Sequence, residues 1–89
     1  MNEETKLQKR CTDFMVREGW LPFRLRSMNG SGWPDYFYIR KGNKVVFIEY
    51  KTPTGTLSDI QKEKIAEIQE LGFDVYVIDR FNELKRIFG

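Results

Sequence analysis

The chain has 89 residues, of which 40% are hydrophobic and 31% are charged, and this balance predicts one folded domain over residues 1–89. A single cysteine, Cys11, excludes an internal disulfide, and the absence of histidine excludes histidine-based catalysis and a closed zinc site. The net charge of +2 permits a polyanionic partner without requiring one. No long apolar stretch and no signal-peptide pattern is present, which predicts a cytoplasmic protein with no membrane partner.

The first part of the chain predicts a helix, a strand and a glycine-rich loop. Residues 3–18 place apolar side chains at helical spacing, and Gly19 ends this helix. Residues 20–26 alternate apolar and basic side chains, as a short strand does. The turn-rich segment 27–34 is expected to be a loop.

The second part predicts a hairpin, a helix, a strand and a last helix. The expected bounds are 35–51 for the hairpin with its turn at 42–43, 57–71 for the helix ended by Gly72, 73–79 for a strand covered on both faces, and 80–89 for a helix capped by Asp79. The resulting order, α-β-β-β-α-β-α, predicts an α/β fold in which helices flank a mixed sheet.

The second hairpin strand, "VVFIEYK", begins apolar on both faces and ends in charges. Because side chains alternate along a strand, Glu49 and Lys51 extend the face that carries Val45 and Phe47. A lone buried carboxylate costs several kcal/mol. Two explanations remain open: a local Glu49–Lys51 ion pair at a frayed strand end, or a shared third partner toward which both side chains point.

Asp35 favours the shared partner. A turn at 42–43 places residue 35 opposite roughly residue 50, which brings Asp35 and Glu49 to the same end of adjacent strands. Two carboxylates there suit a hard cation such as Mg²⁺, which can support phosphodiester hydrolysis. Lys51 is then placed to orient a nucleophilic water or to offset transition-state charge.

These motifs, in this order and spacing, resemble the VRR-NUC (virus-type replication-repair nuclease) branch of the PD-(D/E)XK nucleases. The matching stretches are Gly32-Trp33-Pro34-Asp35, Glu49-Tyr50-Lys51, Gly55 and Leu57-Ser58-Asp59-Ile60-Gln61. The resemblance implies a restriction-endonuclease-like core and a metal-dependent DNA endonuclease that uses Mg²⁺, with Mn²⁺ as a substitute.

The resemblance also implies roles for individual residues. Asp35 and Glu49 would be metal ligands together with the Tyr50 backbone carbonyl, and Lys51 would be the catalytic lysine. Gln61 would support the active site, although Ser58-x-x-Gln61 also fits a helix-capping box.

The family carries a further glutamate on its first helix. Glu4 is the preferred match because it lies on the apolar side of the predicted helix, and Glu3 is the alternative. Either acid also fits ordinary charge complementarity in the first turn of a helix.

Stand-alone members of the family look like homodimeric Holliday-junction resolvases, often viral, so the expected partners are branched or four-way DNA and a second copy of the chain. The alternatives are a flap, single-strand or restriction-type nuclease, and a non-catalytic nucleic-acid-binding module. Candidate DNA contacts, which equally fit a solvated strand edge, are Arg24, Arg26, Ser31, Arg40, Lys41 and Lys44. Trp33 and Tyr36 fit either packing or stacking on an unpaired base.

Overall fold

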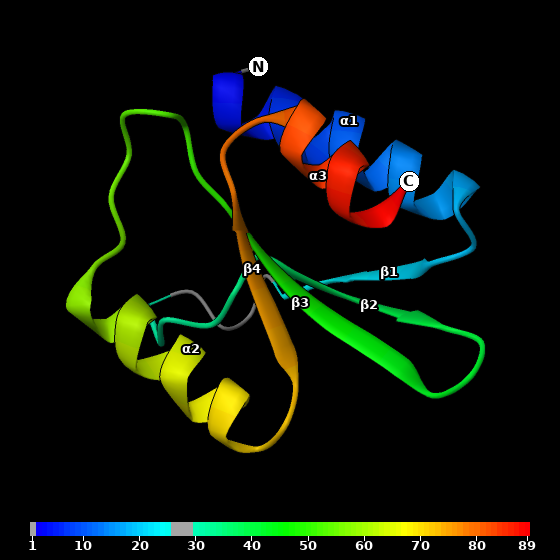
Figure 1. The fold of residues 1–89 in the computed structure, drawn as a ribbon. Coiled ribbons are helices and arrows are strands. Elements are labelled where there is room, and N and C mark those ends of the chain that lie inside the picture. The colour runs from blue at the N-terminus through cyan, green and yellow to red at the C-terminus, as the bar shows by residue number, and fades with distance from the viewer. Residues whose placement is uncertain (1, 26–29) are drawn as a thin grey trace.

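A computed structural model describes residues 2–25 and 30–89 (Figure 1). The predicted order of elements is confirmed. The elements are α1 (Glu3–Arg17), β1 (Leu21–Arg24), β2 (Tyr36–Arg40), β3 (Lys44–Tyr50), α2 (Asp59–Glu70), β4 (Asp74–Ile78) and α3 (Phe81–Phe88).

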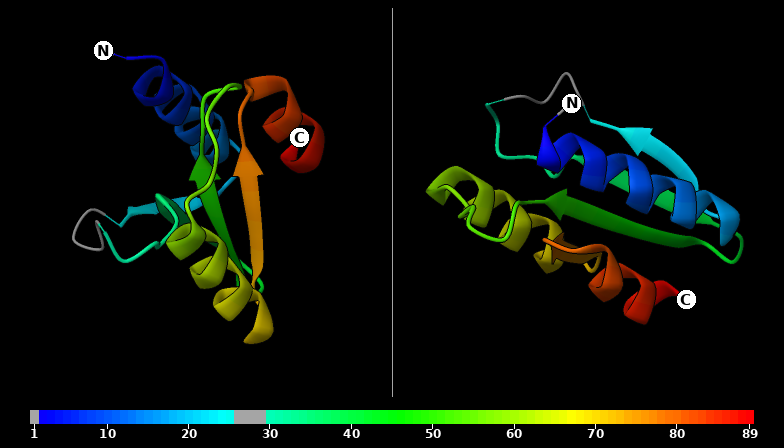
Figure 2. Two further views of the ribbon diagram at one scale, coloured as in Figure 1. Left: turned by 90° about the vertical axis from the view of Figure 1, so that its left-hand side faces the viewer. Right: turned by 90° about the horizontal axis from the view of Figure 1, so that it is seen from above.

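Within the described residues the strands form one four-stranded sheet in the order β1-β2-β3-β4. The first three strands are antiparallel neighbours, whereas β4 returns parallel to β3 through the crossover that contains α2. Helices α1 and α3 lie together on one side of the sheet and α2 lies on the other (Figure 2). The charged end of β3 therefore belongs to a central strand, as its two apolar faces predict.

The main core lies between the sheet and the α1–α3 layer. Tyr38, Ile48 and Tyr50 project from the sheet into this layer and are fully buried, together with Cys11 and Met15 of α1. Burial raises the pKa of the Cys11 thiol to about 11, so this residue stays neutral and acts as a small apolar core group.

The hairpin between β2 and β3 is shifted by one residue from its predicted register. Arg40 pairs with Lys44 around a three-residue loop in which Gly42 and Asn43 have φ values of 90° and 59°. These left-handed conformations suit glycine and asparagine and accommodate a loop one residue longer than the simple two-residue turn. The observed register, continued past Tyr36↔Ile48, places Asp35 opposite Glu49 rather than residue 50.

One expectation at the carboxyl end is wrong. Asp79 does not cap α3, because the cap position is Arg80 and the Asp79 carboxylate instead accepts a 2.8 Å hydrogen bond from the Arg80 Nε. Strand β4 has a helix on each face, as expected, because α3 contacts it from one side of the sheet and α2 from the other. The cover on the α2 side is incomplete, since β4 is an edge strand and Val77 is 44% exposed, whereas Tyr76 and Ile78 pack toward the main core.

None of the described helices combines the length and apolar character needed to cross a membrane.

Candidate active site

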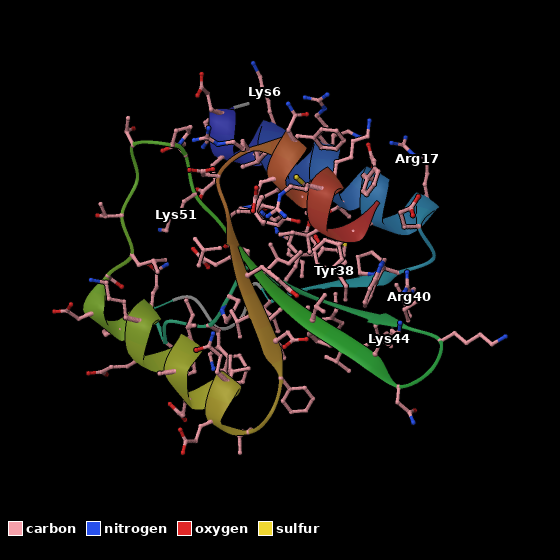
Figure 3. The ribbon with its side chains drawn as sticks, viewed as in Figure 1. Lys6, Arg17, Tyr38, Arg40, Lys44 and Lys51 are labelled. Carbon is pink, nitrogen blue, oxygen red and sulfur yellow. The ribbon has the colours of Figure 1, made fainter. Side chains whose placement is uncertain are left out.

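Three carboxylates meet at one end of the sheet. Glu4 comes from the first turn of α1, Asp35 immediately precedes β2, and Glu49 lies near the end of β3. One carboxylate oxygen from each lies within 4.8 Å of the other two. Lys51 lies at this same end, far from the hairpin residues Arg40 and Lys44 (Figure 3). The structure thus brings together acids that are distant in sequence.

Backbone groups fix Asp35 from both neighbouring strands. The Tyr50 N–H donates a 2.8 Å hydrogen bond to Asp35 Oδ2, and the Leu25 N–H donates a 2.9 Å hydrogen bond to the Asp35 carbonyl. Pro34, which precedes the acid, is fully buried and fixes the approach of the chain. Burial is the largest influence on the Asp35 carboxyl and raises its pKa, although the Tyr50 N–H opposes this.

Glu49 is the most deeply buried acid of the cluster, with 3% of its surface exposed. Its Oε2 accepts a 3.1 Å hydrogen bond from Gln61 Nε2 and lies 3.5 Å from the Lys51 ammonium. Burial, followed by the repulsion of Asp35, raises the pKa of Glu49 to about 7. The local Glu49–Lys51 ion pair therefore exists, but it does not offset the whole cost of burying this carboxylate.

Gln61 joins helix α2 to the acidic cluster. Its Oε1 accepts a 2.9 Å hydrogen bond from the Ser58 N–H, and its own N–H donates to the Ser58 hydroxyl at 3.2 Å, which completes a capping box. The other end of the same amide donates to Glu49. Gln61 therefore both completes the cap of α2 and donates a hydrogen bond to Glu49, two roles that the sequence allowed together.

The structure distinguishes the two glutamates at the start of α1. Asn2 caps this helix by accepting a 2.7 Å hydrogen bond from the Thr5 N–H, and this fixes the orientation of the first turn. Glu4 is then half-buried and joins the cluster, whereas Glu3 is exposed and lines a separate hollow with Thr52 and Asp79.

A cavity of about 500 Å³ opens beside the acids, between the loop at 30–35 and the start of α2. Asp35, Lys51 and Gln61 line it together with apolar residues. Gly32 holds the two walls close together: its φ is +78°, and a Cβ there would lie 2.4 Å from the Ile60 carbonyl oxygen. Only glycine satisfies both conditions.

The predicted DNA contacts fall into different regions. Arg24 ends β1 beside the cluster, and its charge partly opposes the burial that raises the pKa of Asp35. Arg40 and Lys44 lie at the opposite end of the sheet, and Lys41 lies in the hairpin loop between them. The Arg40 guanidinium packs 4.6 Å from the centroid of the Trp20 ring. Ser31 is exposed, and Arg26 lies outside the described residues.

The two aromatic candidates are held by packing. The ring centroid of Trp33 lies 6.3 Å from that of Phe47, and the Lys64 ammonium lies over the Trp33 ring. Tyr36 stacks on Tyr38 with 5.4 Å between ring centroids. These contacts favour packing over stacking on an unpaired base.

The structure also contains a hydrogen-bonded support of the site that the sequence motifs do not indicate. Hydroxyl groups of Thr12, Tyr38 and Tyr50 form a chain with successive oxygen separations of 2.8 Å. This chain anchors Tyr50, whose backbone N–H holds Asp35, from the opposite face of the sheet. The only sequence signal was the spacing that puts tyrosines on the core side of two adjacent strands.

The acidic cluster fits a hard divalent cation. Its side-chain donors are all oxygens. Burial, followed by repulsion from neighbouring acids, raises the pKa of Asp35 and of Glu49, and a bound cation would stabilise their charged forms. A mixed sheet that carries such acids and a lysine at adjacent strand ends defines the nuclease-type class of α/β domains.

The chain belongs to the VRR-NUC family, because the family model described as "VRR-NUC domain" matches residues 3–80. A solved structure described as "VRR_NUC domain" superposes with a TM-score of 0.88 and 22% identity, and the match covers 98% of this chain and 95% of that one. This likeness confirms the predicted fold. Among curated proteins, no significant match is found.

Proposed function

We propose that the chain is a single nuclease domain that hydrolyses DNA phosphodiesters as a metal-dependent, structure-selective endonuclease. The observation that carries this proposal is the convergence of three carboxylates, from α1, from the residue before β2 and from β3, beside an amine and an open cavity. A buried acid pair without a ligand is costly, so a purely structural role gives no account of it.

Asp35 and Glu49, with Glu4 at the third corner, would hold Mg²⁺ or Mn²⁺, and the Tyr50 carbonyl is the predicted backbone ligand. When bound, such a cation supplies Lewis acidity toward a phosphoryl oxygen and lowers the pKa of water. The Tyr50 N–H and the Gln61 amide orient the carboxylates, so the donor set is preorganised.

Lys51 supplies a positive charge beside the acidic cluster. Its side chain is 20% exposed and faces both Glu49 and the cavity, so its ammonium is available to a phosphate or a water placed there. We assign it to orient the attacking water and to offset negative charge on the scissile phosphate. Arg24, exposed at the end of β1, is a proposed phosphate contact whose charge reaches Asp35.

The proposed substrate is branched DNA, with a four-way junction as the first candidate, and the proposed active form is a homodimer. One domain holds one site and cuts one strand, whereas resolving a junction needs two symmetric cuts. A two-fold pair supplies both cuts through one isologous interface.

The test compares wild type with Lys51→Ala on labelled four-way junction, flap and linear duplex, each with Mg²⁺, Mn²⁺ or EDTA. Wild type is expected to cut the junction only with metal and to spare the duplex. Lys51→Ala is expected to lose at least about 100-fold in cleavage while still shifting DNA on a gel. Lys85→Ala, on the exposed surface of α3, is the matched control and should cut like wild type.

Equal cleavage by Lys51→Ala and wild type would remove Lys51 from the mechanism. Metal-dependent cutting of the flap or duplex in preference to the junction would keep the nuclease and reject the substrate. DNA binding without cleavage of any substrate would favour a binding module.

A further inference from the structure

The cavity beside the acidic cluster has two chemically different parts. Its side next to the cluster carries Asp35 and Lys51, which are its only charged side chains among the described residues. The remainder of the lining is uncharged and mixes hydrogen-bonding groups with apolar side chains, which are Leu25, Trp33, Pro34, Leu57 and Ile60. A ligand that reaches past the cluster therefore leaves a charged region for an uncharged one.

The apolar walls of the cavity are fixed by contacts outside it. On the loop side, the Trp33 ring packs against Phe47 with 6.3 Å between centroids, so it is a rigid surface rather than a mobile stacking partner. On the α2 side, Ile60 lies in the first turn and abuts the Gly32 backbone, yet it is 54% exposed. Exposed apolar surface on a fixed wall is stabilised by contact with an apolar ligand.

The cavity also offers hydrogen bonds to an uncharged ligand. Ser58 lines it, and its hydroxyl accepts from the Gln61 N–H at 3.2 Å, which leaves the hydroxyl proton to donate. Thr56 is exposed just before α2 and supplies a second hydroxyl. A volume of about 500 Å³ with apolar walls and a few polar groups is typical of small-ligand sites. A duplex segment is too wide for this space, whereas one nucleotide is of the right size.

We infer that this cavity takes one unpaired nucleobase from the strand whose phosphate lies at the acidic cluster. A polyanionic backbone needs cations along its path, and the described lining beyond Lys51 has none. A base is flat, uncharged and able to hydrogen-bond, and a base that has left its pair is held by apolar side chains and hydrogen bonds. The inference rests on the proposed function for the phosphate at the cluster, and it deepens that function by naming the feature of the substrate that is selected.

An unpaired base in the cavity gives a physical reason for structure selectivity. A base inside a continuous duplex must lose its pairing and its stacking before it can enter, whereas a base at a branch point or in a single strand has less to lose. We therefore expect linear duplex to be disfavoured when the DNA binds, before any bond is broken.

The test uses 2-aminopurine, an adenine analogue whose fluorescence is quenched by stacking in DNA and recovers when the base leaves the stack. It replaces a base at each position around the branch point of a four-way junction in turn, and at the same positions in a continuous duplex. Every protein carries Lys51→Ala, so that the DNA stays intact in Mn²⁺.

Leu57→Ala and Ile60→Ala each remove part of one cavity wall. Leu71→Ala is the matched control, because Leu71 is the C-cap of α2, is 75% exposed and does not line the cavity. Circular dichroism and a Mn²⁺-induced rise in Tm report whether each variant keeps its fold and acidic cluster. Ile60→Ala, at the more exposed position, supplies the answer if Leu57→Ala does not fold.

The control is expected to raise the emission severalfold at one junction position and at none of the duplex positions. Each cavity variant is expected to reduce that rise about fivefold while shifting the junction on a gel like the control. No rise at any position, or an equal rise with the cavity variants and the control, would overturn the assignment. An equal rise in the duplex would overturn the selection of unpaired bases.

The emission is read without cleavage, so it separates the cavity from the proposed function. A rise that depends on the cavity, in a protein that cuts no DNA once Lys51 is restored, would remove the proposed function and leave the cavity assigned. Metal-dependent cleavage with no rise in emission would keep the nuclease and remove the base from the cavity.

Discussion

The buried carboxylate of Glu49 has two direct side-chain partners, yet its pKa remains high. Both Gln61 and Lys51 approach the same oxygen, Oε2. Burial and the neighbouring Asp35 outweigh these contacts, so the charged form is disfavoured unless a further positive charge is present. The metal-free protein therefore stores an unfavourable interaction at the place where the proposed cation binds.

This imbalance predicts a pH dependence of stability in EDTA. The Glu49 pKa is raised from 4.5 to about 7, so the folded state holds the extra proton between these values and the unfolded state releases it. Stability from this group is complete below pH 4.5 and is lost as the pH rises to about 7, at a total cost of about 3 kcal/mol. Glu49→Gln should remove this loss, so that the variant exceeds wild type in Tm at pH 8 and matches it more closely at pH 5.

Wild type and Glu49→Gln also test whether Glu49 is a ligand of the proposed metal ion. Mn²⁺ is expected to raise the Tm of wild type at pH 8 by restoring the missing positive charge, and to leave Glu49→Gln nearly unchanged. An equal metal response in both proteins would remove Glu49 from the ligand set, and a wild-type Tm that rises from pH 5 to pH 8 in EDTA would contradict the raised pKa.

At the scale of elements, the start of α2 connects a helix cap to the acidic cluster. Ser58→Ala removes the hydroxyl that accepts from the Gln61 N–H but leaves the bond between the Gln61 amide and Glu49. Gln61→Ala removes that bond to Glu49. Each change is expected to lower the free energy of unfolding by about 1 kcal/mol. Only Gln61→Ala should also reduce cleavage, by about tenfold or more, because it frees the carboxylate to reorient.

Unfolding in urea and single-turnover cleavage separate the two effects. If Ser58→Ala reduced cleavage as much as Gln61→Ala, Gln61 would act only through the helix cap.

The close approach of the loop at 30–35 to α2 gives a second prediction for these elements. Gly30 and Gly32 both have positive φ, but a Cβ at Gly30 meets open space, whereas one at Gly32 collides with the Ile60 carbonyl. Gly30→Ala should cost about 1 kcal/mol from backbone strain alone. Gly32→Ala should cost clearly more and should also weaken the response to Mn²⁺, because α2 must move and carries Gln61 with it. Similar urea midpoints for the two variants would show that the loop and α2 separate easily.

Much of this architecture was predictable because local patterns agree with the fold. The helical spacing in α1, the glycines after α1 and α2, and the charged end of β3 each specify an element or its end. Periodicity could not reveal that the apolar side of β1 is exposed, because alternation reports that two faces differ and not which one is covered. The hairpin register was missed by one residue because Asn43 adopts a left-handed conformation that lengthens the turn.

The site was predictable to the extent that its residues sit in motifs. Asp35, Glu49 and Lys51 were predictable as neighbours because they lie at the ends of adjacent strands, and the structure brings them together. The choice between Glu3 and Glu4 depends on how α1 crosses the sheet, which is a tertiary property. The hydroxyl chain of Thr12, Tyr38 and Tyr50 joins three elements and has no local signal.

At the scale of the whole molecule, one sheet end holds one acidic cluster, so the outcome on a four-way junction depends on how many competent copies act together. Mixing wild type with an equal amount of Lys51→Ala and letting the subunits exchange should leave about a quarter of the pairs fully active and about half with one active site. Mixed pairs can cut only one strand.

A supercoiled plasmid with an extruded cruciform reports the number of cuts directly, since two cuts within one binding event give linear DNA and one cut gives a nicked circle. If the dimer is the active form, the variant should raise the ratio of nicked to linear product, whereas independently acting monomers would leave that ratio as for wild type diluted twofold.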